Sequence, residues 1–287
     1  MASVTGGLGE LLAIEEIEGA APPTAVGRAR PRFRAWRFVV LVLAGAYFLL
    51  PIYGGLKFAL TGVNGGFSVE AITGLPSAPG FSAAFTLSLK LGLVTVVLSA
   101  LLIVPTAIYV HLRLPKMRRM LEFVTILPIV IPPIVLILGV LNAAPLWMKA
   151  SPYLLSAEYV ILSMPFVYRS LDSGLSAIDL KTLVEASRSL GGNWVKTIWR
   201  VILPNLRPAL LSAMVLTLAL VLGEYTMASL DLWQTIPVWI AQFNSSSNGH
   251  FQVAASMLGL VGTWLLLTLI VSIDRSGSRR RVRAGSK

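Results

Sequence analysis

Residues 176–208 read SAIDLKTLVEASRSLGGNWVKTIWRVILPNLRP, an amphipathic stretch in an otherwise apolar chain. Apolar side chains recur at helical spacing over residues 180–190, which predicts a short helix that Ser176 can cap. Gly191 and Gly192 then end this helix, because glycine readily adopts the left-handed backbone that closes a helix. A second amphipathic segment follows over residues 194–202. We therefore expect two short helices that meet at a glycine elbow.

Six apolar runs flank this stretch, and each is long enough for a helix that crosses a bilayer, which needs about 20 residues. They are Trp36–Leu60, Ala83–Val110, Met120–Leu141, Tyr153–Leu171, Pro208–Leu230 and Phe251–Ile273. The fourth is the least apolar, because it carries Glu158 and contains Pro165. The expected fold is an all-α membrane protein with six transmembrane helices over residues 36–273.

Basic residues mark every second connection between these runs. Residues 28–37 hold five Lys and Arg, residues 113–119 hold four, and residues 169–207 and 275–287 hold six each, together 21 of the 24. By the positive-inside rule, both termini and residues 173–207 lie in the cytoplasm. We expect residues 1–35 to form a mobile cytoplasmic tail and residues 274–287 to form a basic tail at the anionic inner leaflet.

Composition excludes several classes of function. With 55% hydrophobic and 13% charged residues, the chain is far from the composition of a soluble enzyme. The absence of Cys excludes thiol catalysis and thiolate metal sites, and two distant His residues argue against a histidine metal centre. We predict no catalytic or metal site in this chain. We interpret the net charge of +11 as a reflection of membrane topology, and we predict no nucleic-acid binding.

Two features suggest where a solute could pass. Proline inside a span frees backbone groups that a cavity or a neighbour must satisfy, which points to broken helices around a pathway or, equally, to packing kinks. The prolines concerned are Pro105, Pro128, Pro132, Pro133 and Pro165, with the most interrupted run at 127–135. Glu224, followed by Tyr225, is the acid most clearly inside a span. Its carboxylate predicts a pathway or gate, a structural pair with a neighbouring helix, or an interfacial position.

The elbow carries a long spaced motif. Glu185, Ala186 and Ser187 are followed by Gly191 and, nine residues after it, by Val201, Leu203 and Pro204. This pattern resembles the EAA loop of permease subunits of binding-protein-dependent ABC importers, with Ser187 in place of Ala and Val201 in place of Ile. The segments 222–225 and 237–239 are similar to the spermidine/putrescine-type branch of that family.

The resemblance implies a type I ABC importer permease in a prokaryotic cytoplasmic (inner) membrane, working with a binding protein, a second permease and two ATPases that bind ATP and Mg²⁺. In that family the EAA loop is a coupling helix that docks on the ATPase, so Glu185 and Arg188 become candidate docking contacts. An interfacial helix lying on lipid is the alternative. A polyamine-like cation is the first expectation for the substrate. A secondary transporter or channel and a membrane-embedded enzyme are the rival functions.

Overall fold

The computed structural model describes residues 35–61, 65–243 and 249–284, with side chains up to residue 272 in the last range. The expected N-terminal tail and the side chains of the basic C-terminal tail lie outside the described residues. The chain divides into two compact units, Met1–Pro51 and Ile52–Lys287. The helix α2, Ala35–Ala59, crosses the boundary between them. Every element in the described ranges is helical, which confirms the all-α expectation.

The second unit is a bundle of long helices with short helices at its ends. In chain order the elements are α3 (Glu70–Thr73), η1 (Leu75–Ser77), α4 (Phe81–Arg113), η2 (Pro115–Met117), α5 (Arg118–Val130), α6 (Pro133–Ala143), α7 (Leu146–Lys149), α8 (Tyr153–Ser176), α9 (Leu180–Ser189), α10 (Trp194–Thr197), η3 (Ile198–Ile202), α11 (Leu203–Asn205), α12 (Arg207–Gly223), α13 (Thr226–Leu230), α14 (Ile236–Gln242) and α15 (Gly249–Ala284).

Three described helices, α2, α4 and α15, are long and apolar enough to cross a membrane alone. Two bent pairs qualify if each is counted as one span: η2–α5 with α6, bent by 99°, and the α10–α11 segment with α12, bent by 75°. The remaining expected span corresponds to α8, a continuous helix of 24 residues. The number of six spans and the side on which the termini lie stay predictions.

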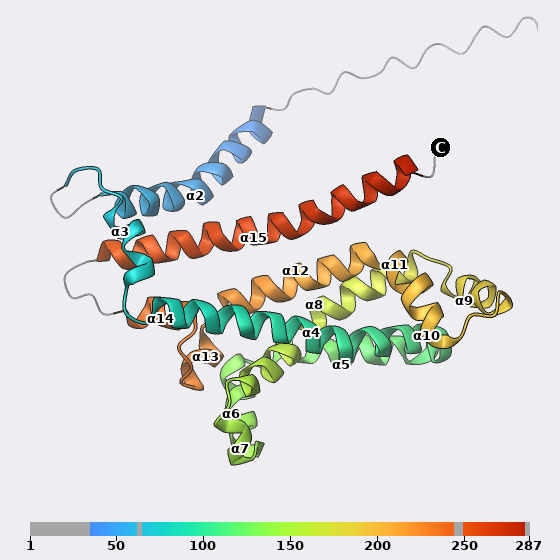
Figure 1. The fold of residues 1–287 in the computed structure, drawn as a ribbon. Coiled ribbons are helices and arrows are strands. Elements are labelled where there is room, and N and C mark those ends of the chain that lie inside the picture. The colour runs from blue at the N-terminus through green and yellow to red at the C-terminus, as the bar shows by residue number, and fades with distance from the viewer. Residues whose placement is uncertain (1–34, 62–64, 244–248, 285–287) are drawn as a thin grey trace, which may run out of the picture. The chain divides into compact units, whose positions relative to one another are not determined.

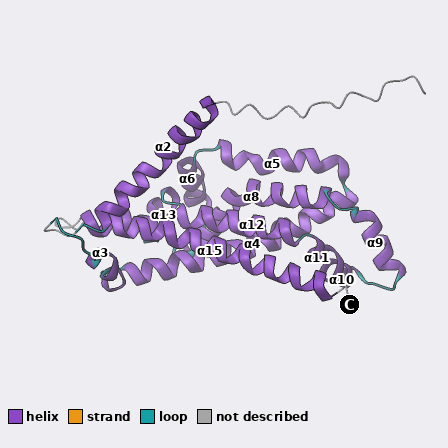
Figure 2. Ribbon diagram, turned by 90° about the horizontal axis from the view of Figure 1, so that it is seen from above, coloured by secondary structure: helices purple, strands orange, loops and turns teal. Residues whose placement is uncertain are grey.

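The helix α8 is the centre of the bundle and packs against α4, α5 and α12 (Figure 1). This position explains its polar composition, because a helix covered by other helices does not have to present apolar side chains to lipid. Glu158, for example, is 1% exposed. The elements α9, α10 and α11 lie at one end of this unit, and α15 runs toward the same end (Figure 2).

The third predicted span is broken where the sequence is most interrupted. The helix α5 ends at Val130, Ile131 and Pro132 are extended, and Pro133 begins α6. Pro128, by contrast, lies inside α5, and Pro105 and Pro165 lie inside the continuous helices α4 and α8. The expectation of a break is therefore confirmed at Pro132 and wrong at these three prolines. A single missing amide donor is tolerated where the rest of a long helix is held by its neighbours.

The fifth predicted span, Pro208–Leu230, is wrong as a single helix. The helix α12 ends at Gly223, Glu224 is extended (φ −78°, ψ 125°), and the short helix α13 begins at Thr226. Glu224 therefore lies at a break between two helices and not within a continuous helix. The physical reason is a set of hydrogen bonds to the Glu224 carboxylate, described below.

Candidate functional site

The elbow segment, residues 179–205, begins with a capped helix. Asp179 caps α9, since its carboxylate accepts hydrogen bonds from the Thr182 amide (3.3 Å) and the Thr182 hydroxyl (2.7 Å). These donors lower the pKa of the Asp179 carboxyl. The expected cap at Ser176 is wrong, because α8 continues through Ser176, whose hydroxyl donates to the Asp172 carbonyl oxygen (2.6 Å). The helix α8 therefore extends three residues beyond Ser173.

Acidification should loosen the start of α9. The pKa of Asp179 is lower in the folded protein, so its stabilising effect is present above the ordinary Asp pKa of about 3.9 and is lost as the pH falls through the folded value. We expect hydrogen-exchange protection of the Thr182 amide to fall between pH 7 and pH 3. The Lys196 amide is the matched control, because its cap, Asn193, is neutral. Equal protection of Thr182 at both pH values would contradict the assignment.

The elbow itself is a helix end closed by two glycines. Gly191 has a φ of +74°, in the left-handed region, and its amide donates to the Arg188 carbonyl oxygen (2.9 Å). The Gly192 amide donates to the Ser187 carbonyl oxygen (2.9 Å). These two bonds form a Schellman motif, which confirms the predicted elbow at Gly191. Gly192 is required for a different reason: a Cβ atom there would lie 2.6 Å from both the carbonyl oxygen and the hydroxyl of Ser187.

A hydroxyl pair holds the two sides of the elbow together. The Thr197 hydroxyl donates to the Asn193 carbonyl oxygen (3.0 Å), so the Ser187 hydroxyl donates to the Thr197 oxygen across 2.8 Å. Thr197 is fully buried. Alanine, the residue of the EAA pattern at this position, could not make this bond. The departure at Ser187 therefore adds a hydrogen bond that fixes α9 relative to α10.

The apolar side chains of the elbow segment anchor it in the bundle. Leu180 and Val184 of α9 and Ile202 of η3 belong to one buried cluster. The same cluster contains Ile103, Val104, Ala107, Ile108, Val167, Tyr168, Leu171, Leu175, Leu206 and Ala213 from or next to α4, α8 and α12. A rigid segment with such an anchor moves with the helices to which it is packed.

The eight candidate coupling residues separate into three groups. Glu185, Ala186 and Arg188 are exposed on α9, whereas Ser187 and Gly191 build the elbow. Val201, Leu203 and Pro204 are partly buried at the junction with α12. Three large apolar side chains of the elbow segment are exposed as well: Leu190 89%, Val195 64% and Trp199 69%. The exposed residues of the first group are available to a partner. The residues of the other two groups hold the elbow segment in its shape and position.

The second candidate region is the break after α12. The Glu224 carboxylate accepts hydrogen bonds from the amides of Met227 (2.8 Å) and Ala228 (3.2 Å), and from the hydroxyl of Tyr159 (3.0 Å) on α8. Tyr159 is fully buried. These contacts favour the structural-pair interpretation of Glu224, because its carboxylate caps α13 and binds a neighbouring helix. Its neighbour Tyr225 is 45% exposed.

The structure brings the two breaks close together. The helix α13, which follows Glu224, packs against α6, which follows Pro132 and Pro133. Ile137 of α6 and Met227 of α13 share one buried cluster with Tyr159. The candidate pathway residues after the two breaks thus belong to one region of the bundle, whereas Pro128 is buried inside α5.

Comparisons with known proteins place the chain in a family. Residues 103–283 match the family described as binding-protein-dependent transport system inner membrane component. The chain belongs to this family. It is therefore a permease subunit of a binding-protein-dependent ABC importer, a multi-pass protein of the prokaryotic cytoplasmic membrane, and family membership implies ATPase and substrate-binding-protein partners.

Relatives of this permease differ in substrate. It is 31% identical to a probable molybdenum ABC transporter permease protein of Haloferax volcanii over 81% of this chain and 89% of that protein. It is 30% identical to a sulfate transport system permease protein of Synechococcus elongatus, over 43% of this chain and 45% of that protein. Other matched permeases are named for ferric iron and 2-aminoethylphosphonate.

A solved structure shares the fold. The crystal structure of a bacterial ABC transporter involved in the import of the acidic polysaccharide alginate matches the permease with a TM-score of 0.65 at 16% identity, over 85% of this chain and 96% of that chain.

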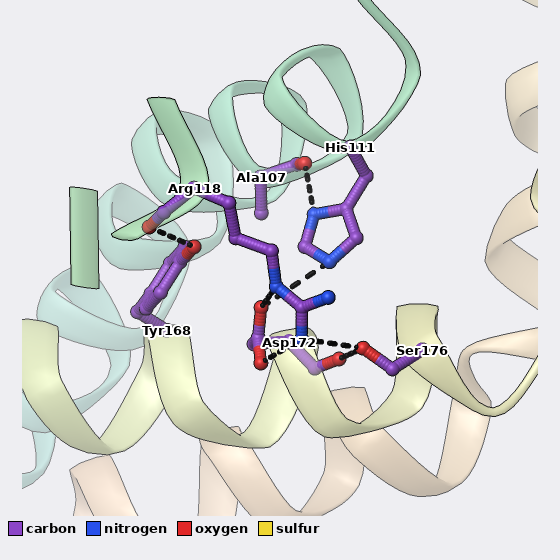
Figure 3. A network of polar contacts seen from close by, with 6 residues as sticks. All are labelled: Ala107, His111, Arg118, Tyr168, Asp172 and Ser176. Carbon is purple, nitrogen blue, oxygen red and sulfur yellow. Dashed lines mark hydrogen bonds and ion pairs between the residues drawn. The ribbon is translucent and has the colours of Figure 1, made fainter. Parts of the chain in front are cut away.

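A polar network at the end of the bundle was missed by the sequence analysis. Arg118, at the start of α5, donates two hydrogen bonds to the Asp172 carboxylate of α8 (2.6 and 2.7 Å) and a third to the Ser176 hydroxyl (2.7 Å) (Figure 3). His111 of α4 lies 3.2 Å from Asp172, and its Nδ1 is 2.9 Å from the Ala107 carbonyl oxygen. No sequence signal joins Arg118 to Asp172, which lie 54 positions apart.

Proposed function

We propose that the permease forms half of a translocation pathway and couples it to a cytoplasmic ATPase through the elbow segment. The observation that carries this proposal is the combination of an exposed face and a buried anchor on one rigid segment. Glu185, Ala186 and Arg188 are exposed, whereas Leu180 and Val184 of the same helix are buried in the bundle. A partner that binds the exposed face therefore displaces the bundle helices with it.

Charge supports a protein partner on this face. Glu185 and Arg188 have opposite charges, and no ion pair within the described part of the chain uses either of them. An ATPase surface with complementary charges gives such residues partners and orients the docking. Lipid headgroups suit the alternative, an interfacial helix, through Trp194, Trp199 and Lys196. We assign Glu185, Ala186 and Arg188 to the ATPase and leave the tryptophans at the membrane surface.

The pathway is proposed to follow the two helix breaks. Broken spans leave backbone groups that can line a polar route through a membrane. The exposed Tyr225 and the extended residues Ile131 and Pro132, just before Pro133, supply such groups, and Glu224 holds one break open by capping α13. A second permease, similar or identical, would complete the pathway, and two ATPases would drive it. The extracytoplasmic binding protein delivers the solute.

The substrate is proposed to be a small oxyanion. The relatives named for molybdenum and sulfate support this choice, because molybdenum and sulfur are both supplied in water as tetrahedral oxyanions. The first expectation, a polyamine-like cation, has no support among these relatives. The acids near the breaks do not oppose an anion, since Glu158 is buried and the Glu224 carboxylate is occupied by three donors.

Reconstitution tests the proposed function. We expect the permease, purified with its ATPase and incorporated in proteoliposomes, to accumulate molybdate or sulfate only when ATP and the loaded binding protein are present. Omitting either should reduce uptake to the level of empty liposomes. Spermidine serves as the comparison substrate. Uptake by the permease alone, driven by an ion gradient without ATP, would instead establish a secondary transporter and overturn the proposal.

A further inference from the structure

The contact between Arg118 and Asp172 is stronger and more directional than an ordinary surface ion pair. The guanidinium of Arg118 donates from Nε (2.6 Å) and from Nη2 (2.7 Å) to the two carboxylate oxygens, an arrangement that fixes orientation as well as distance. A third donation, from Nη2 to the Ser176 hydroxyl (2.7 Å), reaches the last turn of α8. We name Arg118, Asp172 and Ser176 the clamp.

Other contacts hold the clamp in place. The Tyr168 hydroxyl, one turn before Asp172 on α8, lies 3.4 Å from the Arg118 carbonyl oxygen and donates to it (Figure 3). His111 approaches the Asp172 carboxylate from α4, and both of its ring nitrogens face oxygen acceptors. The clamp therefore joins the ends of three helices, and the Asp172 side chain is 21% exposed.

The clamp lies between the elbow segment and the broken third span. On one side, only three residues separate Ser176 at the end of α8 from Leu180 at the start of α9. On the other side, Arg118 is the first residue of α5, whose last residue, Val130, adjoins the break at Ile131 and Pro132. A helix transmits displacement along its axis as a nearly rigid body, so a movement of α9 reaches the break if the clamp holds α5 to α8.

We propose that the clamp is the joint through which movement of the elbow segment is transmitted to the broken third span, with Arg118 as a positioning residue. This inference rests on the proposed function, since it requires the elbow segment to be driven by an ATPase. Lysine at position 118 would keep the charge but lose the two-bond fork, so the angle between α5 and α8 would no longer be fixed. Loss of the fork uncouples ATP hydrolysis from transport while the elbow segment still binds the ATPase.

The experiment compares Arg118→Lys with Arg119→Lys in the reconstituted complex of permease, ATPase and binding protein. Arg119 is the matched control, because it is exposed, adjacent and outside the clamp. We expect Arg118→Lys to retain the ATPase during purification and to hydrolyse ATP, but to transport about tenfold less substrate per ATP hydrolysed. Arg119→Lys should transport as the unmodified permease does. Unchanged coupling in Arg118→Lys, or loss of its ATPase, would overturn the proposal.

A double-variant cycle distinguishes a joint formed by both residues together from two residues that each stabilise the permease independently. Asp172→Asn removes the charge from the other side of the clamp, and we expect it to lower coupling as Arg118→Lys does. If the two residues act as one joint, the variant that carries both changes couples no worse than either single variant. Multiplication of the two losses would contradict a shared joint. Failure of the proposed function is a separate outcome, because the unmodified permease would then retain no ATPase.

Discussion

Gly192→Ala abolishes the association of the permease with its ATPase, although it adds a single methyl group. The added Cβ would lie 2.6 Å from the carbonyl oxygen and from the hydroxyl of Ser187, a distance at which backbone atoms must move. The movement breaks the hydrogen bond from the Gly192 amide and the contact of Ser187 with Thr197. We expect transport to fall at least tenfold, measured as ATP-dependent uptake, and the ATPase to be lost during purification.

Two comparisons make this result specific to the elbow. Gly191→Ala should have a smaller effect, since no atom lies within 4 Å of its added methyl and the left-handed backbone costs an alanine about 1–2 kcal/mol. Gly259→Ala, in α15, also meets nothing within 4 Å and should transport normally. Normal ATPase retention by Gly192→Ala would show that the closed elbow is not needed for docking.

Glu224→Ala should destabilise the permease and stop transport without releasing the ATPase. The change leaves the buried Tyr159 hydroxyl without its acceptor and removes the cap from the Met227 and Ala228 amides. An unsatisfied buried polar group costs about 1–3 kcal/mol, and a lost cap costs about 1 kcal/mol. We expect a lower melting temperature, an uptake reduced at least tenfold, and unchanged co-purification of the ATPase, because the elbow segment is untouched.

Glu224→Gln separates the two roles considered for this residue. Glutamine keeps a side-chain oxygen that can accept from Tyr159 or from an amide, so a purely structural role predicts near-normal melting and near-normal uptake. A role in the pathway or gate predicts that uptake falls although the melting temperature does not. The exposed Glu70, in α3, supplies the control: Glu70→Gln should change neither quantity. Unchanged transport kinetics in Glu224→Gln would remove the gate assignment.

The break in the third span and the elbow were predictable, because each has a local cause. Paired prolines at 132 and 133 remove amide donors and exclude the helical backbone before them. Gly191 and Gly192 allow the left-handed helix end. Both signals lie in the residues that form the feature, so no knowledge of the rest of the fold was needed.

The break at Glu224 and the clamp were not predictable, because each involves a contact with a residue far away in the sequence. Glu224 sits in an apolar run that looks like a continuous helix, and one of the three donors to its carboxylate at the break, the Tyr159 hydroxyl, lies 65 positions earlier. Arg118 reads as one of several basic residues in a cytoplasmic connection, and Asp172 as an ordinary acid. Their pairing depends on how α5 packs against α8. Ser176 was misassigned for a similar reason, since α8 runs past its expected end.

Cysteine cross-linking tests the docking of the elbow segment most directly. The chain contains no Cys, so a single Ala186→Cys change introduces one reactive thiol on the exposed face of α9. We predict that a short bifunctional thiol reagent joins this variant to a cysteine in the ATPase, whereas Ser77→Cys, near α3 at the other end of the bundle, forms no such product. Cross-linking of the ATPase from Ser77→Cys and not from Ala186→Cys would contradict coupling through the elbow segment.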